Sequence, residues 1–267
     1  MFVLNDDSAH WLIIPQASHA FLAMQVALHW GNRAAERPSP KAECLAGVLL
    51  HDSGWDRYDA APEPDGQGRP KAFDRMPPAR HLEIWRRCIT CAGAHAGYAG
   101  LLVARHFLRL ASWKIRDLEE QGDRKALAAT RAFVDEANVI AEKHQRELET
   151  DPRFANATAG IGLERNLAIL GACDGVAVYL CAGMTGPFSL TVHGRQDGDL
   201  EVSLERVGDT IVRLRPWPLE GRRLTVNCEA RRIPARSYGS SQELADAIAD
   251  GPRVRLAFTL LSPGEPA

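Results

Sequence analysis

The sequence predicts a mainly α-helical protein with a C-terminal antiparallel β-rich appendage. Apolar residues recur at helical spacing through most of residues 16–181, whereas apolar and polar residues alternate after Gly186, as in half-buried strands. No internal repeat or low-complexity tract separates the two parts. We therefore expect a helical domain over residues 1–185, with a helical insertion at residues 111–150, and a β-rich appendage over residues 186–267.

The composition is that of an ordinary globular protein and excludes several kinds of partner. Of the 267 residues, 45% are hydrophobic and 25% are charged, and the net charge is −2. Because there is no basic excess, neither nucleic acid nor an anionic membrane is an expected partner. The N-terminal segment carries Asp6 and Asp7 where a signal peptide would be basic, and no apolar run approaches about 20 residues, so we expect neither export nor membrane insertion. The six cysteines lie mostly in apolar runs, which indicates reduced thiols and a cytoplasmic location.

The first elements are predicted to be two short strands and a helix. Phe2–Leu4 and Trp11–Ile14 are apolar runs around a polar segment, which is typical of a small hairpin that covers the core at most. A helix follows through residues 16–30, and Ser18 is the expected N-terminal cap.

A second helix and a long loop come next. The helix begins at about Lys41, after two prolines, and ends at His51. The loop covers residues 53–78, where glycines and prolines interrupt every period. It also contains three aromatic residues, which are rare in disordered segments, so we expect a functional loop.

The later helices carry isolated polar residues at positions that look inward. The third helix carries His81, and the fourth, over residues 96–110, carries His106. Residues 161–181 form a strongly apolar helix with Asp174 in its middle. A carboxylate is costly to bury there without a partner or a cation.

Six side chains with metal-binding atoms occupy these predicted helices. Two of them, His51 and Asp52, are adjacent at a helix end, where both can reach one cation or bridge two if other elements supply the remaining ligands. An isolated His-Asp pair is most often a surface pair, so the hypothesis depends on the complete set. The other candidates, each on a separate helix, are His19, His81, His106 and Asp174.

The order His, His-Asp, His, His, Asp resembles that of the HD-domain superfamily over residues 11–182. It is most similar to the subtype that holds two metal ions. The chain is also similar to a bacterial family catalogued only as a domain of unknown function. This resemblance implies an HD-domain-like helical bundle for the first part of the chain.

The resemblance also implies a role for each candidate ligand. His19, His51, Asp52 and Asp174 match the one-metal set, and His81 and His106 would complete a second site, with Asp52 as the bridging and catalytic carboxylate. Imidazole and carboxylate ligands suit iron, manganese, cobalt or zinc. His95, which lies between two glycines, could bind in place of His81, whereas His144 is expected on an exposed helical face.

The sequence departs from the superfamily directly after the doublet. Many superfamily phosphodiesterases have Gly-Lys there, whereas this chain has Gly54-Trp55. An indole cannot neutralise a phosphate, so either another cation such as Arg105 binds the anion or the substrate is not a phosphate ester. The substrate-binding candidates are Asn32, Trp55 and Arg105. Asn32 lies at the end of the first predicted helix.

Three functions are consistent with this pattern. The leading hypothesis is a phosphohydrolase that acts on a small phosphorylated or nucleotide-like molecule through a hydroxide activated by two metal ions. The alternative is a non-haem di-iron oxygenase of the same superfamily, which Trp55 in place of lysine favours. The third is a metal-stabilised binding or regulatory module, in which the β-rich part could pair subunits into a homo-oligomer.

Overall fold

The computed structural model describes residues 1–193 and 198–267, and the contacts between residues divide the chain into two compact units. Each unit combines segments that are distant in the sequence. This division differs from the predicted one at residues 185 and 186, because the N-terminal segment shares a unit with the C-terminal strands. The first unit comprises Met1–Glu36, Trp55–Met76 and Ala172–Ala267, and the second comprises Arg37–Gly54 and Pro77–Gly171.

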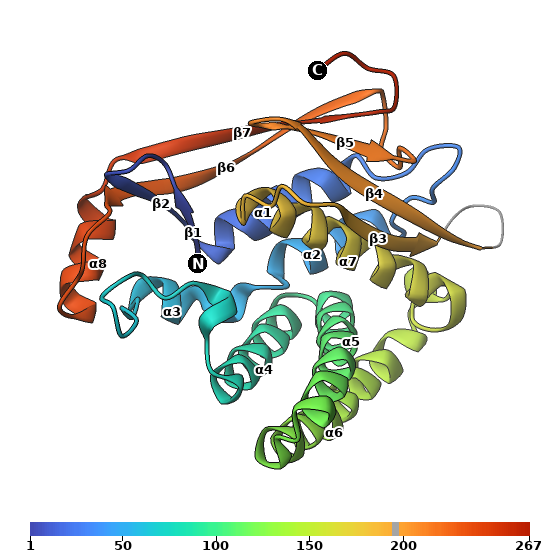
Figure 1. Cartoon of the computed structure of the whole chain (residues 1–267). Coiled ribbons are helices and arrows are strands. Elements are labelled where there is room, and N and C mark those ends of the chain that lie inside the picture. Colours follow the sequence, from blue (N-terminus) through green and yellow to red (C-terminus); the bar gives the residue numbers. More distant parts are fainter. Residues whose placement is uncertain (194–197) are drawn as a thin grey trace. The chain divides into compact units, whose positions relative to one another are not determined.

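A seven-stranded sheet forms the body of the first unit (Figure 1). The strand order is β1-β2-β6-β7-β5-β4-β3, and β5 and β7 are parallel while all other neighbours are antiparallel. The strands are β1 (Phe2–Asn5), β2 (His10–Ile14), β3 (Phe188–His193), β4 (Asp199–Gly208), β5 (Ile211–Arg215), β6 (Arg223–Pro234) and β7 (Arg253–Leu261).

The predicted fold class, mainly α with a C-terminal antiparallel appendage, is wrong. The N-terminal hairpin is present as predicted, but β2 pairs with β6, so that Ile13 lies opposite Arg231 and both ends of the chain share one mixed sheet. The fold is therefore mixed α/β. Strand partners are selected by long-range packing, which the periodicity of a single segment does not contain.

Three helices pack on this sheet. α1 (Gln16–Leu28) contacts β6, α8 (Ser241–Asp250) contacts the same strand, and the second half of α7 (Gly160–Cys181) packs on β3. The side chain of Gln25 on α1 bonds both the amide N–H and the carbonyl of Asn227, at 3.1 and 2.7 Å. The Gln25 amide therefore continues the hydrogen bonding of β6 beyond the point where β2 ends.

The start of α1 is held by a residue from the predicted loop. The expected cap, Ser18, is wrong, because the helix begins at Gln16 after Pro15. The carboxylate of Asp59 accepts the N–H of Gln16 at 2.6 Å, which stabilises the helix N-terminus. Asp59 lies in α3 (Asp56–Ala60), so the segment predicted as loop contains this helix and also a 3-10 turn at Phe73–Arg75.

The second unit is a helical bundle of α2 (Lys41–Leu50), α4 (Pro78–His95), α5 (Gly97–Gln121), α6 (Arg124–Glu149) and the first half of α7 (Figure 1). A 3-10 turn at Pro152–Phe154 joins α6 to α7. The segment predicted as an insertion, residues 111–150, forms the end of α5 and all of α6. Gly122 ends α5 with a φ of 71°, and Asp123 caps α6 by accepting the N–H of Ala126 at 3.0 Å.

The connection between α4 and α5 depends on two glycines. A Cβ on Gly100 would lie 2.7 Å from the Cα of Gly93 and 2.7 Å from Nε2 of His144. The prediction that His144 lies on an exposed face is therefore wrong. His144 packs from α6 into the space that the glycines leave, and burial lowers its pKa. None of the helices in the described residues is long and apolar enough to cross a membrane.

We expect Gly100→Ala to lower the free energy of unfolding by about 2 kcal/mol or more, because the new methyl group meets backbone atoms that cannot rotate away. The matched control is Gly171→Ala in α7, where a Cβ meets nothing within 4 Å and helix propensity adds up to about 1 kcal/mol. Urea unfolding measures both changes. Equal stability of the two variants would contradict this account of the packing.

Candidate metal-binding groups in the two units

In the second unit the His51-Asp52 doublet directly follows α2. His51 is buried, and its Nδ1 lies 2.7 Å from the carbonyl oxygen of Val48. A carbonyl can only accept a hydrogen bond, so Nδ1 carries a proton, and Nε2 is the ring nitrogen that offers a lone pair when the imidazole is neutral. The backbone thus sets both the tautomer and the orientation of this imidazole.

The other ring nitrogen of His51 faces the Asp52 carboxylate. Nε2 lies 3.3 Å from Oδ2 of Asp52, whose side chain is 13% exposed. Two acceptors at this separation repel each other unless a cation or a second proton accompanies them. This geometry is characteristic of a pair that shares a positive charge.

Direct backbone packing holds the chain that follows the doublet. The N–H of Gly54 donates to Sγ of Cys88 on α4 at 3.3 Å. A Cβ on Gly54 would lie 2.5 Å from backbone atoms of Ile84 and Cys88, so only glycine fits here. The periodicity of the sequence does not reveal this contact, because packing between a helix and a loop leaves no periodic signal.

A third histidine of the predicted set lies beside the doublet. His106 on α5 is buried, and its ring is 5.8 Å from the ring of His51 in an edge-to-face arrangement. Phe107 packs against His106 at 5.4 Å between ring centroids. The second unit therefore brings His51, Asp52 and His106 together.

The remaining histidines of this unit lie elsewhere on α4. His81 is half-buried, 6.2 Å from the ring of Trp85, and lines a groove of about 200 Å³ that also includes Trp113. His95 is exposed at the end of α4, where its Nδ1 donates to the carbonyl of Cys91 at 2.8 Å. His95 thus serves as a cap of the helix C-terminus in this structure.

In the first unit His19 and Asp174 form a pair. Nε2 of His19 on α1 lies 3.0 Å from Oδ1 of Asp174 on α7, and their side chains are 1% and 18% exposed. The ring of Phe2 packs on His19 at 4.9 Å. The apolar helix that carries Asp174 therefore presents its carboxylate to the histidine predicted to accompany it.

Both pairs have a spacing that suits metal ligation. Two atoms bonded to one ion at about 2.1 Å lie about 3.0 Å apart at a right angle and about 3.4 Å apart at the tetrahedral angle. The observed separations are 3.0 Å for His19 and Asp174 and 3.3 Å for His51 and Asp52. Both separations are therefore compatible with two neighbouring ligands of one ion.

Two predicted substrate-binding residues have structural contacts. The amide of Asn32 donates to the carbonyls of Trp217 and Leu219 at 2.8 and 3.1 Å, and its oxygen accepts two backbone N–H groups. The guanidinium of Arg105 bonds Asn138 and Gln145 on α6. A substrate contact for either residue stays a prediction.

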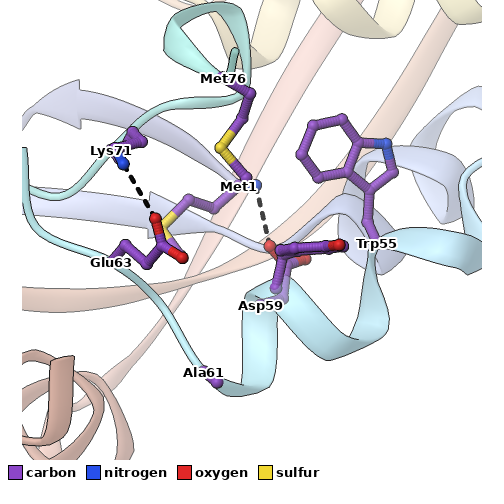
Figure 2. Close-up of a pocket in the computed structure, with 8 residues that line it drawn as sticks. Met1, Trp55, Asp59, Ala61, Glu63, Lys71 and Met76 are labelled. Atoms are coloured by element: carbon purple, nitrogen blue, oxygen red, sulfur yellow. Dashed lines mark hydrogen bonds and ion pairs between the residues drawn. The ribbon is translucent and has the colours of Figure 1, made fainter. Parts of the chain in front are cut away.

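Trp55, the third candidate, is 4% exposed in the first unit. It lines a cavity of about 10 Å³ whose wall includes Met1, Asp59 and Met76 (Figure 2). The amino group of Met1 donates to Asp59 at 2.8 Å across this space. A cavity of this size holds about one water molecule, so this side of the indole packs against protein.

Three buried cysteines do not provide reactive thiolates. Burial raises the pKa of Cys44 to about 12. Burial also raises the pKa of Cys173 well above its ordinary value, and the neighbouring charge of Asp174 adds to this shift. The pKa of Cys181 is also raised, mainly by a hydrogen bond with Cys228 and secondly by burial. Nucleophilic cysteine chemistry is therefore disfavoured.

We expect iodoacetamide at pH 8 to modify Cys91 before any other thiol, because Cys91 is partly exposed. With a pKa of about 12, only about one Cys44 thiol in ten thousand is ionised at this pH. Mass spectrometry of the native and the guanidinium-unfolded protein measures the modification. Alkylation of native Cys44 or Cys173 as fast as Cys91 would contradict the burial described here.

Comparison with known proteins gives a single kind of match. A family model described as "Protein of unknown function (DUF3891)" matches residues 1–235, which is most of the chain. No curated protein and no solved structure matches the chain.

Proposed function

The chain belongs to the DUF3891 family, and we propose that it is a metal-dependent hydrolase of small phosphorylated molecules. The observation that carries the proposal is the His51-Asp52 doublet. The Val48 carbonyl binds the proton on Nδ1, so Nε2 is directed at the Asp52 carboxylate 3.3 Å away, and the two atoms repel each other when the imidazole is neutral. A divalent cation resolves this repulsion, and imidazole with carboxylate is a common ligand combination.

The proposed ligands come from both units. The second unit supplies His51 and Asp52, with His106 beside them, and the first unit supplies the pair of His19 and Asp174. The support for their role as ligands is the order of these residues along the chain, which resembles that of the HD-domain superfamily. The same resemblance assigns His81 to a second ion.

The chemistry follows from the proposed ligands. Bound divalent ions lower the pKa of a coordinated water and offset negative charge on a phosphoryl group. Asp52 would accept a proton from this water while the oxygen of the water bonds to phosphorus. The bond between phosphorus and the leaving oxygen would then break. The hydrogen bond from His51 to Val48 keeps the imidazole from rotating during this exchange.

The alternative function is a di-iron oxygenase with the same ligands. The residue after Gly54 is a buried indole rather than an ammonium group, so this position offers no charge for a phosphate. The identity of the bound metal separates the two functions. Stable mixed-valent iron would favour the oxygenase, whereas manganese, cobalt or zinc would favour the hydrolase. We further propose a cytoplasmic location, since the buried thiols suit a reducing compartment.

We expect the purified protein to bind about two divalent ions per chain. His81→Ala or His106→Ala should reduce the count to about one, and Asp52→Ala should remove both ions because a bridging carboxylate belongs to both sites. His95→Ala is the matched control, since its exposed side chain caps α4. Elemental analysis measures the metal, and circular dichroism checks that each variant is folded.

The outcomes distinguish the ligand sets. Unchanged metal content in the His81 and His106 variants would contradict two ions, whereas loss of metal in His95→Ala would assign that residue in place of His81. Metal that stays bound in folded Asp52→Ala would contradict the proposed centre.

We expect the metal-loaded protein to hydrolyse bis(p-nitrophenyl) phosphate or p-nitrophenyl phosphate. Asp52→Asn should lower kcat by at least about a hundredfold, because the amide cannot accept the proton of the attacking water. Glu229→Gln is the control, because Glu229 is exposed and pairs only with Arg253 among the described residues. Full activity of Asp52→Asn would exclude Asp52 as the catalytic base.

A further inference from the structure

A groove of about 310 Å³ lies in the first unit, lined by the β1–β2 hairpin and by residues 65–75. Its volume is within the range of small-molecule sites, about 300 to 1,000 Å³. The hairpin contributes Phe2 and Trp11, and the opposing segment contributes Phe73 with several charged residues. The groove therefore combines flat apolar surfaces with charges.

The aromatic side chains can bind a flat ring. Trp11 is only half-buried, although it stands on a paired strand opposite Asn5. The rings of Phe2 and Phe73 are in contact at 4.5 Å between centroids. Aromatic surfaces of this kind bind planar groups by stacking. Phe2 also touches His19, so the groove adjoins the proposed metal ligand of this unit.

One charge of the groove is used by the fold. The carboxylate of Asp65 accepts the N–H groups of Gln67 and Arg69 at 2.8 and 2.9 Å. These bonds lower the pKa of Asp65, and the nearby guanidinium groups of Arg69 and Arg75 lower it further. Asp65 therefore stays ionised and is held within its own turn.

Three other charges face solvent in the groove. Arg69, Arg75 and Asp74 are exposed, and within residues 1–193 and 198–267 their side chains form no hydrogen bond or ion pair. The ionised Asp65 offsets part of the positive charge of the two arginines, whereas their guanidinium N–H groups and the Asp74 carboxylate can still bond a ligand. A ligand that neutralises them carries a negative group for the arginines and a positive group for the aspartate.

We propose that this groove binds a small zwitterion with a flat ring, of the aromatic α-amino-acid class. The ring stacks on Trp11, the carboxylate binds Arg69 and Arg75, and the ammonium group binds Asp74. Guanidinium groups bind carboxylates through charge-assisted hydrogen bonds. The site does not depend on the proposed metal centre, because none of the residues that line it is a proposed metal ligand.

Isothermal titration calorimetry of the full chain at neutral pH tests the proposal with four probes. L-phenylalanine should bind saturably. 3-Phenylpropionate, which has no ammonium group, phenethylamine, which has no carboxylate, and L-alanine, which has no ring, should each bind at least about tenfold more weakly. The proposal is overturned if L-phenylalanine shows no saturable binding in the millimolar range, or if any of the other probes binds equally well.

Charge-removing variants then assign the residues. Arg69→Gln or Arg75→Gln should weaken L-phenylalanine binding about tenfold, and Asp74→Asn should abolish the preference for L-phenylalanine over 3-phenylpropionate. These side chains are exposed, so folding should be unaffected. Arg253→Gln, which removes an exposed arginine outside the groove, is the control and should bind as the wild type does. Unchanged affinity and selectivity in all three groove variants would overturn the assignment.

Discussion

A hydrogen bond between a histidine and a backbone carbonyl determines the chemistry that the doublet can perform. Nδ1 of His51 donates its proton to Val48, so the other ring nitrogen, Nε2, faces the Asp52 carboxylate and repels it when the imidazole is neutral. The imidazole is buried, so water does not separate the two groups as it would on the surface. Such an arrangement is costly unless a positive charge accompanies it.

The surrounding packing keeps the doublet in this arrangement. The chain leaves it through Gly54, whose backbone lies directly on α4, and Ser53 donates its hydroxyl to the carbonyl of Leu50 at 2.8 Å. His106 stands edge-on to His51 and limits the rotation of its ring. In the first unit the Asp59 cap at the start of α1 serves a similar purpose, because it fixes the first turn of the helix that carries His19.

The sequence predicted local features well and long-range ones poorly. Helical spacing located α2 and α7, and the hairpin at the N-terminus was also evident. The pairing of His19 with Asp174, 155 residues apart, agrees with the polar residues noted on apolar helices. By contrast, the union of β2 with β6 in one mixed sheet depends on contacts between distant segments, which no local pattern encodes.

Side-chain roles also depended on partners that the sequence does not identify. Asn32 looked available for a ligand, but both ends of its amide are bonded to neighbouring loops. His144 lies in a charged run, yet it fills a space made by two glycines on other helices. In both cases burial and bonding follow from tertiary packing, which overrides the local polarity of the segment.

The central claim is that a divalent cation binds His51 and Asp52, and anomalous X-ray diffraction from crystals of the metal-replete protein tests it most directly. Data collected at the absorption edge of the metal found by elemental analysis should show a peak about 2.0 to 2.3 Å from Nε2 of His51 and from a carboxylate oxygen of Asp52. A crystal whose protein contains metal but shows no anomalous peak at this doublet would contradict the account.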